Sequence, residues 1–230
     1  MTCDLEAVPG GDVFRVARRP DPWAYPSWAY VGSDGTFDNR FDDPESSYRV
    51  LYACSQRLGA FIETLARFRP DPEVVAGLAN IEGADDGALE PGQVPASWVE
   101  DRLIGTGKLD GAVAHIGHSR SLSYLRSTMA SRLVHYGLVD LDAGVIRLTA
   151  PRRFTQEISR LVFECTDATG GRGFAGIRYA SRLGDEFENW AVFEPLVPSG
   201  ASEEDIRLDD SDLVAALDRL GITLFVGGSE

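Results

Sequence analysis

The chain has 230 residues, of which 43% are hydrophobic, so it can bury one sizeable core and we expect a single domain over residues 1–230. Its formal net charge is −14. This argues against nucleic acid as a partner, because binding to a phosphate backbone depends on Lys and Arg. No apolar run approaches the roughly 20 residues that cross a bilayer, so we also expect no membrane partner.

The N-terminus and the cysteines favour a cytoplasmic protein. The first residues lack the basic and apolar regions of a signal peptide. The three cysteines, Cys3, Cys54 and Cys165, are odd in number, widely separated and form no C-x-x-C pair, which predicts neither a disulfide framework nor a zinc ribbon. We interpret Cys54 and Cys165 as buried small hydrophobic residues in a reducing cytoplasm.

The first predicted strand is short, from Val13 to Val16, and Arg15 interrupts its apolar run. Arg15 is either a site residue or an edge-strand arginine, and the sequence favours neither. Residues 20–35 then combine three prolines and two glycines with four aromatic side chains. This loop caps the core or forms one wall of a ligand cleft.

Residues 50–54 form a nearly continuous apolar run, typical of a strand covered on both faces. The next segment, 57–68, predicts a helix laid on that strand, with an apolar stripe at helical spacing. Glu63 lies off the stripe, and the small residues Gly59, Ala60 and Ala66 leave room beside it. The alternative is a solvated glutamate weakly paired with Arg67, four residues later.

The remaining elements are predicted from the spacing of apolar residues and from glycine, proline and helix-capping residues. We expect a strand over 74–81, a helical turn over 98–104, an amphipathic helix from Ser119 or Ser121 to Gly137, and a helix with Pro151 near its start. Residues 198–210 are polar and acidic, which predicts a loop. A helix stopped by Gly221 and a strand over 222–226 complete the chain.

Two motifs suggest chemistry that their context does not support. His115 and His118 bracket a glycine and have no third ligand at a metal-binding spacing, so no metal site is expected. Residues 171–176 match G-x-G-x-x-G, but a dinucleotide fingerprint must follow a strand and open a helix. This copy follows a helix and leads into a strand over 175–180, so we interpret it as a turn.

An anionic ligand would need a local basic pocket on this acidic protein. Arg15, Arg40 and Arg49 lie close in sequence and could supply it. Arg152 and Arg153 lie near a predicted helix N-terminus, where their charges oppose the helix dipole. They are further candidates for an anion site, although a solvated pair is the commoner arrangement.

The chemistry-bearing residues favour glycosidic cleavage over nucleophilic hydrolysis. Histidine is scarce, so Ser181 has few bases and is a poor nucleophile. A carboxylate such as Glu63 can stabilise the oxocarbenium-like state formed when an N-glycosidic bond breaks. Arginine forks suit the phosphates of a dinucleotide, and the rings of Phe41 and Tyr52 suit stacking on its planar base.

Five short segments carry a family resemblance: Arg40-Phe41 in a loop, Leu51-Tyr52-Ala53 in a strand, Glu63 in the next helix, Gly176-Ile177-Arg178-Tyr179-Ala180-Ser181-Arg182, and Asn189-Trp190-Ala191-Val192-Phe193. In this order they resemble the RES-domain family, named for an arginine, a glutamate and a serine that match Arg40, Glu63 and Ser181. The resemblance covers roughly residues 13–194, and the C-terminal helix and strand, about 209–227, lie beyond it.

The resemblance implies a mixed α/β (α+β) fold similar to ADP-ribosyltransferases and diphtheria toxin, with a central mixed, split β-sheet flanked by helices. It implies an enzyme that degrades NAD, releases nicotinamide and transfers ADP-ribose to phosphate or water. Many members are toxins paired with an Xre-type antitoxin. NAD as substrate and phosphate as a candidate co-substrate are the only small molecules implied, and a homo-oligomer stays open.

The resemblance also implies residue roles. Arg40 would anchor the phosphates or ribose of NAD, Glu63 would stabilise the transition state at the nicotinamide ribose, and Ser181 would orient that sugar. Tyr52 would line the nicotinamide pocket, and Arg15 is a weaker candidate for binding.

Some features depart from the family pattern. Asn39 stands where glycine often precedes the arginine, Ala180 stands where proline often precedes the serine, and the chain is longer than compact toxin members. The departures argue against a toxin role more than against the active-site residues. Two alternatives therefore stay open: a protein ADP-ribosyltransferase, and a catalytically silent module for NAD binding or protein interaction.

Overall fold

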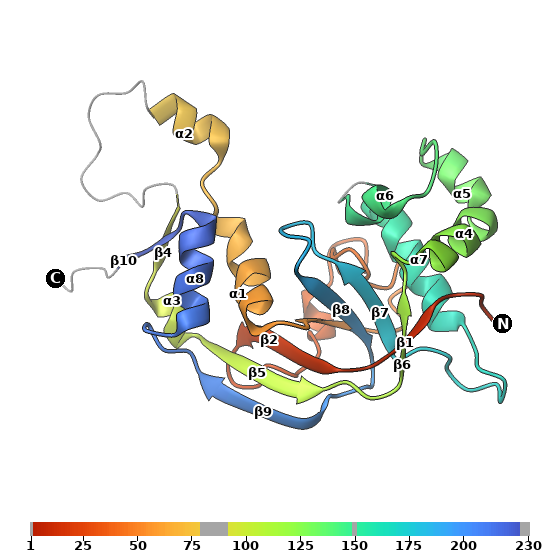
Figure 1. Cartoon of the computed structure of the whole chain (residues 1–230), viewed down its shortest axis with the longest axis horizontal. Coiled ribbons are helices and arrows are strands. Elements are labelled where there is room, and N and C mark those ends of the chain that lie inside the picture. The colour runs from red at the N-terminus through yellow and green to blue at the C-terminus, as the bar shows by residue number, and fades with distance from the viewer. Residues whose placement is uncertain (1, 79–91, 149–150, 226–230) are drawn as a thin grey trace.

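The computed structural model describes residues 2–78, 92–148 and 151–225, and it has a mixed α+β architecture built on one curled sheet (Figure 1). The eight strands follow the order β1-β6-β7-β8-β3-β2-β5-β9, and every neighbouring pair is antiparallel except β6 and β7. A second, parallel pair joins β10 to β4. The strands are β1 (Ala7–Pro9), β2 (Asp12–Arg18), β3 (Val50–Cys54), β4 (Gln93–Pro95), β5 (Arg102–Lys108), β6 (Ala112–His115), β7 (Gly176–Ala180), β8 (Glu188–Phe193), β9 (Ser199–Asp205) and β10 (Thr223–Phe225).

The sheet is split between β2 and β3, as the resemblance implied. These strands share one register pair, Phe14 with Cys54, whereas β2 pairs with β5 over its whole length from Asp12 to Arg18. Strand β3 likewise pairs along its full length with β8. Past the shared pair the backbones diverge, and the resulting gap positions the candidate site.

Helices cover the two halves of the sheet separately (Figure 1). Helices α1 and α8 pack beside each other over β2 and β5, burying a cluster that includes Phe61, Leu65 and Leu213. Helices α4 to α7 cover the half formed by β6, β7 and β8, where Phe154 and Ile158 are buried. The helices are α1 (Arg57–Leu65), α2 (Pro72–Leu78), α3 (Ser97–Glu100), α4 (Ser119–Thr128), α5 (Ala130–His135), α6 (Ala143–Arg147), α7 (Arg152–Glu164) and α8 (Ser211–Leu220), with 3-10 turns at Trp28–Tyr30 and Ala66–Phe68.

The aromatic loop over residues 20–35 caps the core. Trp23 is buried in a third cluster with Val13 and Leu51, whereas Tyr30 is 78% exposed. Of the two roles predicted for this loop, the structure supports the cap, because Trp23 packs into the sheet and no residue of the loop lines the candidate pocket.

Several local predictions are confirmed. Strand β3 and helix α1 occupy the expected segments, and α7 begins directly after Pro151. Helix α8 ends at Gly221, which has a φ of 64° that favours glycine, and strand β10 follows. Residues 171–175 form the predicted turn between α7 and β7, and Gly176, the last residue of the motif, begins the strand.

Other predictions of secondary structure are wrong. The polar segment 198–210 contains the edge strand β9, whose seven residues are all exposed, so no apolar alternation marks it. Residues 72–78 form helix α2 and not a strand, with the Asp71 side chain accepting from the Glu73 N–H, while 79–81 lie outside the described residues. In the segment 98–104 the helical turn stops at Glu100, and strand β5 follows.

The predicted helix from residue 119 to 137 is two helices. Met129 has a non-helical backbone (φ −103°, ψ 19°) between α4 and α5, and the N-cap is His118 and not a serine. The apolar spacing did not reveal the break, because Leu125, Met129 and Leu133 are all buried on one side across it.

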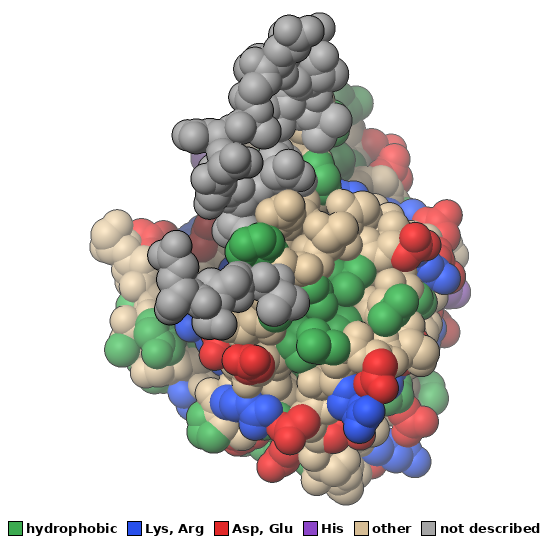
Figure 2. Space-filling view, turned by 90° about the vertical axis from the view of Figure 1, so that its left-hand side faces the viewer, with side chains coloured by type: hydrophobic (Ala, Val, Ile, Leu, Met, Phe, Trp, Pro, Cys, Tyr) green, Lys and Arg blue, Asp and Glu red, His purple; other side chains and the backbone are tan. Residues whose placement is uncertain are grey.

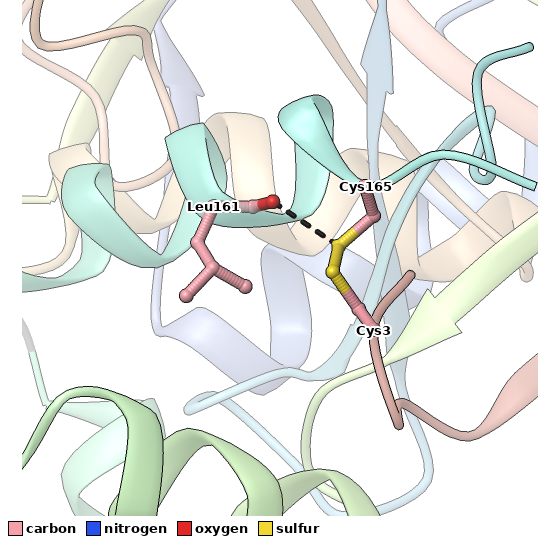
Figure 3. Close-up of a disulfide and its surroundings, with 3 residues drawn as sticks. All are labelled: Cys3, Leu161 and Cys165. Atoms are coloured by element: carbon pink, nitrogen blue, oxygen red, sulfur yellow. Dashed lines mark hydrogen bonds between the residues drawn. A yellow bond between two sulfur atoms is a disulfide. The ribbon is translucent and has the colours of Figure 1, made fainter. Parts of the chain in front are cut away.

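Cysteine usage differs from the expectation. Cys3 and Cys165 form a disulfide, with their Cα atoms 5.7 Å apart, and the Cys165 sulfur lies 3.2 Å from the carbonyl oxygen of Leu161 (Figure 3). Cys165 is buried, as predicted, but the expectation that it forms no disulfide is wrong. The two cysteines are separated by 162 positions, and only the fold brings the N-terminal segment to the end of α7. Cys54 is buried and free, as predicted.

The described residues contain neither a membrane-spanning helix nor a cluster of metal ligands. None of their helices combines the length and apolarity that a membrane span requires. His115 and His118 have ring centroids 5.9 Å apart, and no cluster of three metal-ligating side chains occurs in the described ranges.

Candidate active site

A pocket of about 350 Å³ opens where β2 and β3 diverge, which is within the range of small-molecule sites. Its walls come from β2, β3, β7, β8, helix α1 and the loops before β3 and after β7, with α7 contributing its first residue. Of the six predicted site residues, Arg15, Arg40, Tyr52 and Glu63 line it. Phe41 and Ser181 do not belong to its lining.

Glu63 projects from the side of α1 that does not pack into the core. Helix α1 buries Phe61, Ile62 and Leu65 on its apolar stripe, which leaves the half-buried Glu63 facing the pocket. Its Oε1 atom accepts hydrogen bonds from Ser181 Oγ (2.5 Å) and Asn189 Nδ2 (2.7 Å). The alternative pairing with Arg67 is not what the structure shows, since that guanidinium lies over the ring of Phe68.

Ser181 supports Glu63 from behind and does not face the pocket. Its side chain is buried, with 1% of the residue exposed, and Oγ accepts from the Leu183 N–H at 2.9 Å while donating to Glu63. The hydroxyl therefore joins the loop after β7 to helix α1. In this structure it orients the carboxylate.

Asn189 is a site residue to which the sequence analysis assigned no role. It is buried, lines the pocket and donates to Glu63. Its Oδ1 accepts from the thiol of Cys54 at 2.9 Å, and burial together with the charge of Glu63 raises the pKa of that thiol. The available signal was a polar side chain directly before the apolar run 190–193 of β8.

Tyr52 and Phe41 organise the loop that carries Arg40. The Tyr52 hydroxyl donates to Asp42 Oδ1 (2.9 Å) and accepts from the Phe41 N–H (3.0 Å), and burial raises the pKa values of both Tyr52 and Asp42. Phe41 is fully buried, with its ring centroid 4.6 Å from that of Tyr179, so the prediction that Phe41 stacks on a ligand base is wrong. Tyr179 lines the pocket instead.

Arg15 crosses the split in the sheet. Its Nε donates to the Pro22 carbonyl (2.8 Å) and its Nη1 to the Tyr52 carbonyl (2.5 Å), so the guanidinium binds a carbonyl of the strand from which β2 has diverged. Strand β2 lies between β3 and β5, so the edge-strand interpretation is wrong. Burial lowers the pKa of Arg15 to about 10, which leaves it a cation at neutral pH.

Arg40 is held between rings and a helix end. Its guanidinium carbon lies 5.1 Å from the ring centroids of both Phe41 and Tyr179, and Nη2 donates to the Ile146 carbonyl of α6. Burial lowers the pKa of Arg40. Its Nε is buried and has no hydrogen-bond partner among the described residues, so one donor stays available in a desolvated place.

The predicted basic pocket exists with a different set of arginines. Arg49 pairs with Glu194 (Nε to Oε2, 2.9 Å) and does not line the pocket. Arg152 and Arg182 do line it, and Arg152 lies 3.0 Å from an Asp38 carboxylate oxygen. The prediction that Arg49 helps to form the basic pocket is therefore wrong. Arg152 lines the pocket, whereas a solvated arginine pair at 152 and 153 was the commoner expectation.

The pocket carries excess positive charge on an acidic protein. On the face shown in Figure 2, basic and acidic side chains are interspersed. Arg57, which lies outside the pocket lining, pairs with three carboxylates. By contrast, Arg15, Arg40 and Arg182 form no salt bridge with any described carboxylate. Glu63 is the only carboxylate in the described pocket lining, against four arginines. Arg15 and Arg40 are also desolvated, and buried cations that lack an ionic partner are costly, so an anion that enters the pocket is favoured.

The RES domain model matches residues 12–215 of the 230 residues, and the chain belongs to this family. The match extends past the 13–194 region identified from the sequence and includes the start of α8. No curated protein matches the chain.

Proposed function

We propose that this RES-domain protein cleaves the nicotinamide–ribose bond of NAD and transfers ADP-ribose to phosphate or water. The observation that carries the proposal is the orientation of Glu63 in the pocket. Both hydrogen bonds to its carboxylate end on Oε1, and among the described residues no bond is made to Oε2. One oxygen is anchored, and the other is available to a substrate.

The reaction suits a fixed carboxylate. As the C1′–N bond breaks, its electron pair moves to the pyridinium nitrogen, so nicotinamide leaves as a neutral molecule and positive charge develops on the ribose. Glu63 Oε2 would stabilise that charge. Phosphate oxygen or water then bonds to C1′, and with water one proton is released.

The remaining groups suit the rest of NAD. The diphosphate is an anion of the kind that arginine forks bind, and four arginines surround the pocket without a matching set of carboxylates. The rings of Tyr52 and Tyr179 line the same pocket and offer faces for the planar nicotinamide. Arg40 is one of these arginines, and its guanidinium lies beside the ring of Tyr179.

The test is mass spectrometry of NAD incubated with purified protein, with and without phosphate. A phosphate-dependent ADP-ribose phosphate product would identify a phosphorylase, and free ADP-ribose a glycohydrolase. Intact NAD under both conditions would contradict the proposal. ADP-ribose attached to polypeptide would identify a protein ADP-ribosyltransferase instead.

Glu63→Gln tests the residue assignment. Glutamine keeps a carbonyl oxygen that can accept from Ser181 and Asn189, so the fold should persist while the negative charge is lost. We expect a fall in kcat of at least about 100-fold, comparable to the removal of a transition-state electrostatic contact. Glu73→Gln, an exposed helical glutamate outside the pocket, is the matched control. Full activity in Glu63→Gln would refute the mechanism.

A further inference from the structure

Asn189 forms a second anchor for Glu63, independent of Ser181. It lies in β8, between β3 and β7, and its backbone is in register with Cys54 on one side and Tyr179 on the other. Ser181, by contrast, lies just after the end of β7. A side chain on an interior strand is held more precisely than one on a loop, so Asn189 is the more rigid of the two donors.

Cys54 determines which way the Asn189 amide points. An asparagine amide has a donor end and an acceptor end, and Glu63 requires the donor end. The Cys54 thiol donates to Oδ1 (2.9 Å), which leaves Nδ2 directed at Glu63 (2.7 Å). Because burial and the nearby Glu63 charge raise the pKa of Cys54, the thiol keeps its proton and remains a donor at neutral pH.

We infer that Asn189 is a positioning residue, which holds the Glu63 carboxylate with Oε2 toward the pocket, and that the Cys54 thiol fixes the amide orientation that makes this possible. The inference rests on the proposed function, because it concerns the same site. It explains a chain of hydrogen bonds from the buried Cys54 and Asn189 to the half-buried Glu63, which packing alone does not require.

The first variant is Asn189→Asp, which has nearly the same shape and places a carboxylate where the donor was. We expect kcat for nicotinamide release to fall by about 10–100-fold, as is usual when a residue that orients a site group is lost, with KM changed by less than about threefold. Two neighbouring carboxylates disfavour joint ionisation. The acid limb of the pH profile should therefore move to higher pH, which a purely structural role would not produce.

The second pair is Cys54→Ala and Cys54→Ser. If Cys54 acts as a hydrogen-bond donor, serine should restore most of the kcat that alanine loses. If Cys54 is only a small apolar residue in the core, alanine should be the better replacement and serine the worse one. The order of these two variants decides the question even if Asn189→Asp does not fold.

A measurement without substrate separates this inference from the proposed function. The side-chain amide signals of Asn189, followed by NMR in ligand-free protein, should shift as Glu63 ionises, and the shift should vanish in Glu63→Gln. If wild-type protein leaves NAD intact, the proposed function fails while this titration still decides the contact. An Asn189 signal that does not respond to Glu63, an unchanged pH profile in Asn189→Asp, or an alanine variant as active as the serine one would overturn the inference.

Discussion

Ser181→Ala should destabilise the protein as well as reduce its activity, because the hydroxyl is buried and bonded at both ends. Its Oγ donates to Glu63 and accepts from the Leu183 N–H, with 1% of the residue exposed. A hydrogen bond to a charged group contributes about 1.5–3 kcal/mol, and an unsatisfied buried donor costs about 1–3 kcal/mol. Glu63 and Leu183 are only half-buried, so water can partly replace the hydroxyl and the lower ends of both ranges apply.

The expected loss is therefore about 2–3 kcal/mol in the free energy of unfolding. For a chain of this size, each kcal/mol corresponds to about 2–4 °C in Tm, so Tm should fall by about 4–12 °C. Urea unfolding should show a lower midpoint with an unchanged slope. Ser202→Ala, on the exposed edge strand β9, is the control and should stay within about 0.5 kcal/mol of wild type.

A double-mutant cycle isolates the contact. If Ser181 acts through Glu63, then combining Ser181→Ala with Glu63→Ala should destabilise by less than the sum of the single changes, with a coupling of about 1–2 kcal/mol. A Tm for Ser181→Ala within about 1 °C of wild type, or an additive cycle, would show that the hydroxyl does not stabilise the fold through Glu63. In that case the hydroxyl would be free for the substrate sugar, as the family resemblance implied.

Three other measurements follow from the structure. Arg49 depresses the pKa of Glu194, so this pair contributes stability that is present above about pH 4.5 and is lost as pH falls. Glu194→Gln should therefore lower the free energy of unfolding at pH 7, and the variant should lose less of it than wild type between pH 7 and 3 in denaturant unfolding. Parallel pH curves for the two proteins would contradict this. ADP-ribose at about 100 times its Kd should stabilise the fold by about 2.7 kcal/mol and so raise Tm. Arg40→Gln should reduce this increase in Tm at the same ADP-ribose concentration. An equal increase in wild type and variant would exclude Arg40 from anion binding. Cys3→Ser should lower the free energy of unfolding by about 2–5 kcal/mol, because it removes the disulfide with Cys165. Wild-type protein that is denatured in guanidinium without reductant should show one free thiol by titration. Three free thiols would exclude the disulfide.

Elements with local signals could be predicted from the amino-acid sequence alone. The apolar stripe of α1 fixed which side of that helix packs, and so placed Glu63 off the core. Gly221 marked the end of α8 through a left-handed turn, which involves only neighbours within a few positions. The order of the short family segments identified Arg40 and Glu63, and both line the pocket.

The contacts between residues far apart in the sequence depend on the fold. Glu63 contacts Ser181 and Asn189 across 118 and 126 positions, and no periodicity links residues at such separations. The divergence of β2 from β3 created the gap that Arg15 crosses, whereas the pairing of β3 with β8 brings Arg49 beside Glu194, outside the pocket. Edge strand β9 escaped prediction for the same reason, since backbone pairing with β5 holds it while none of its side chains is buried. Helical spacing and caps act over about four residues, whereas strand register and the packing of the sheet halves depend on the whole fold.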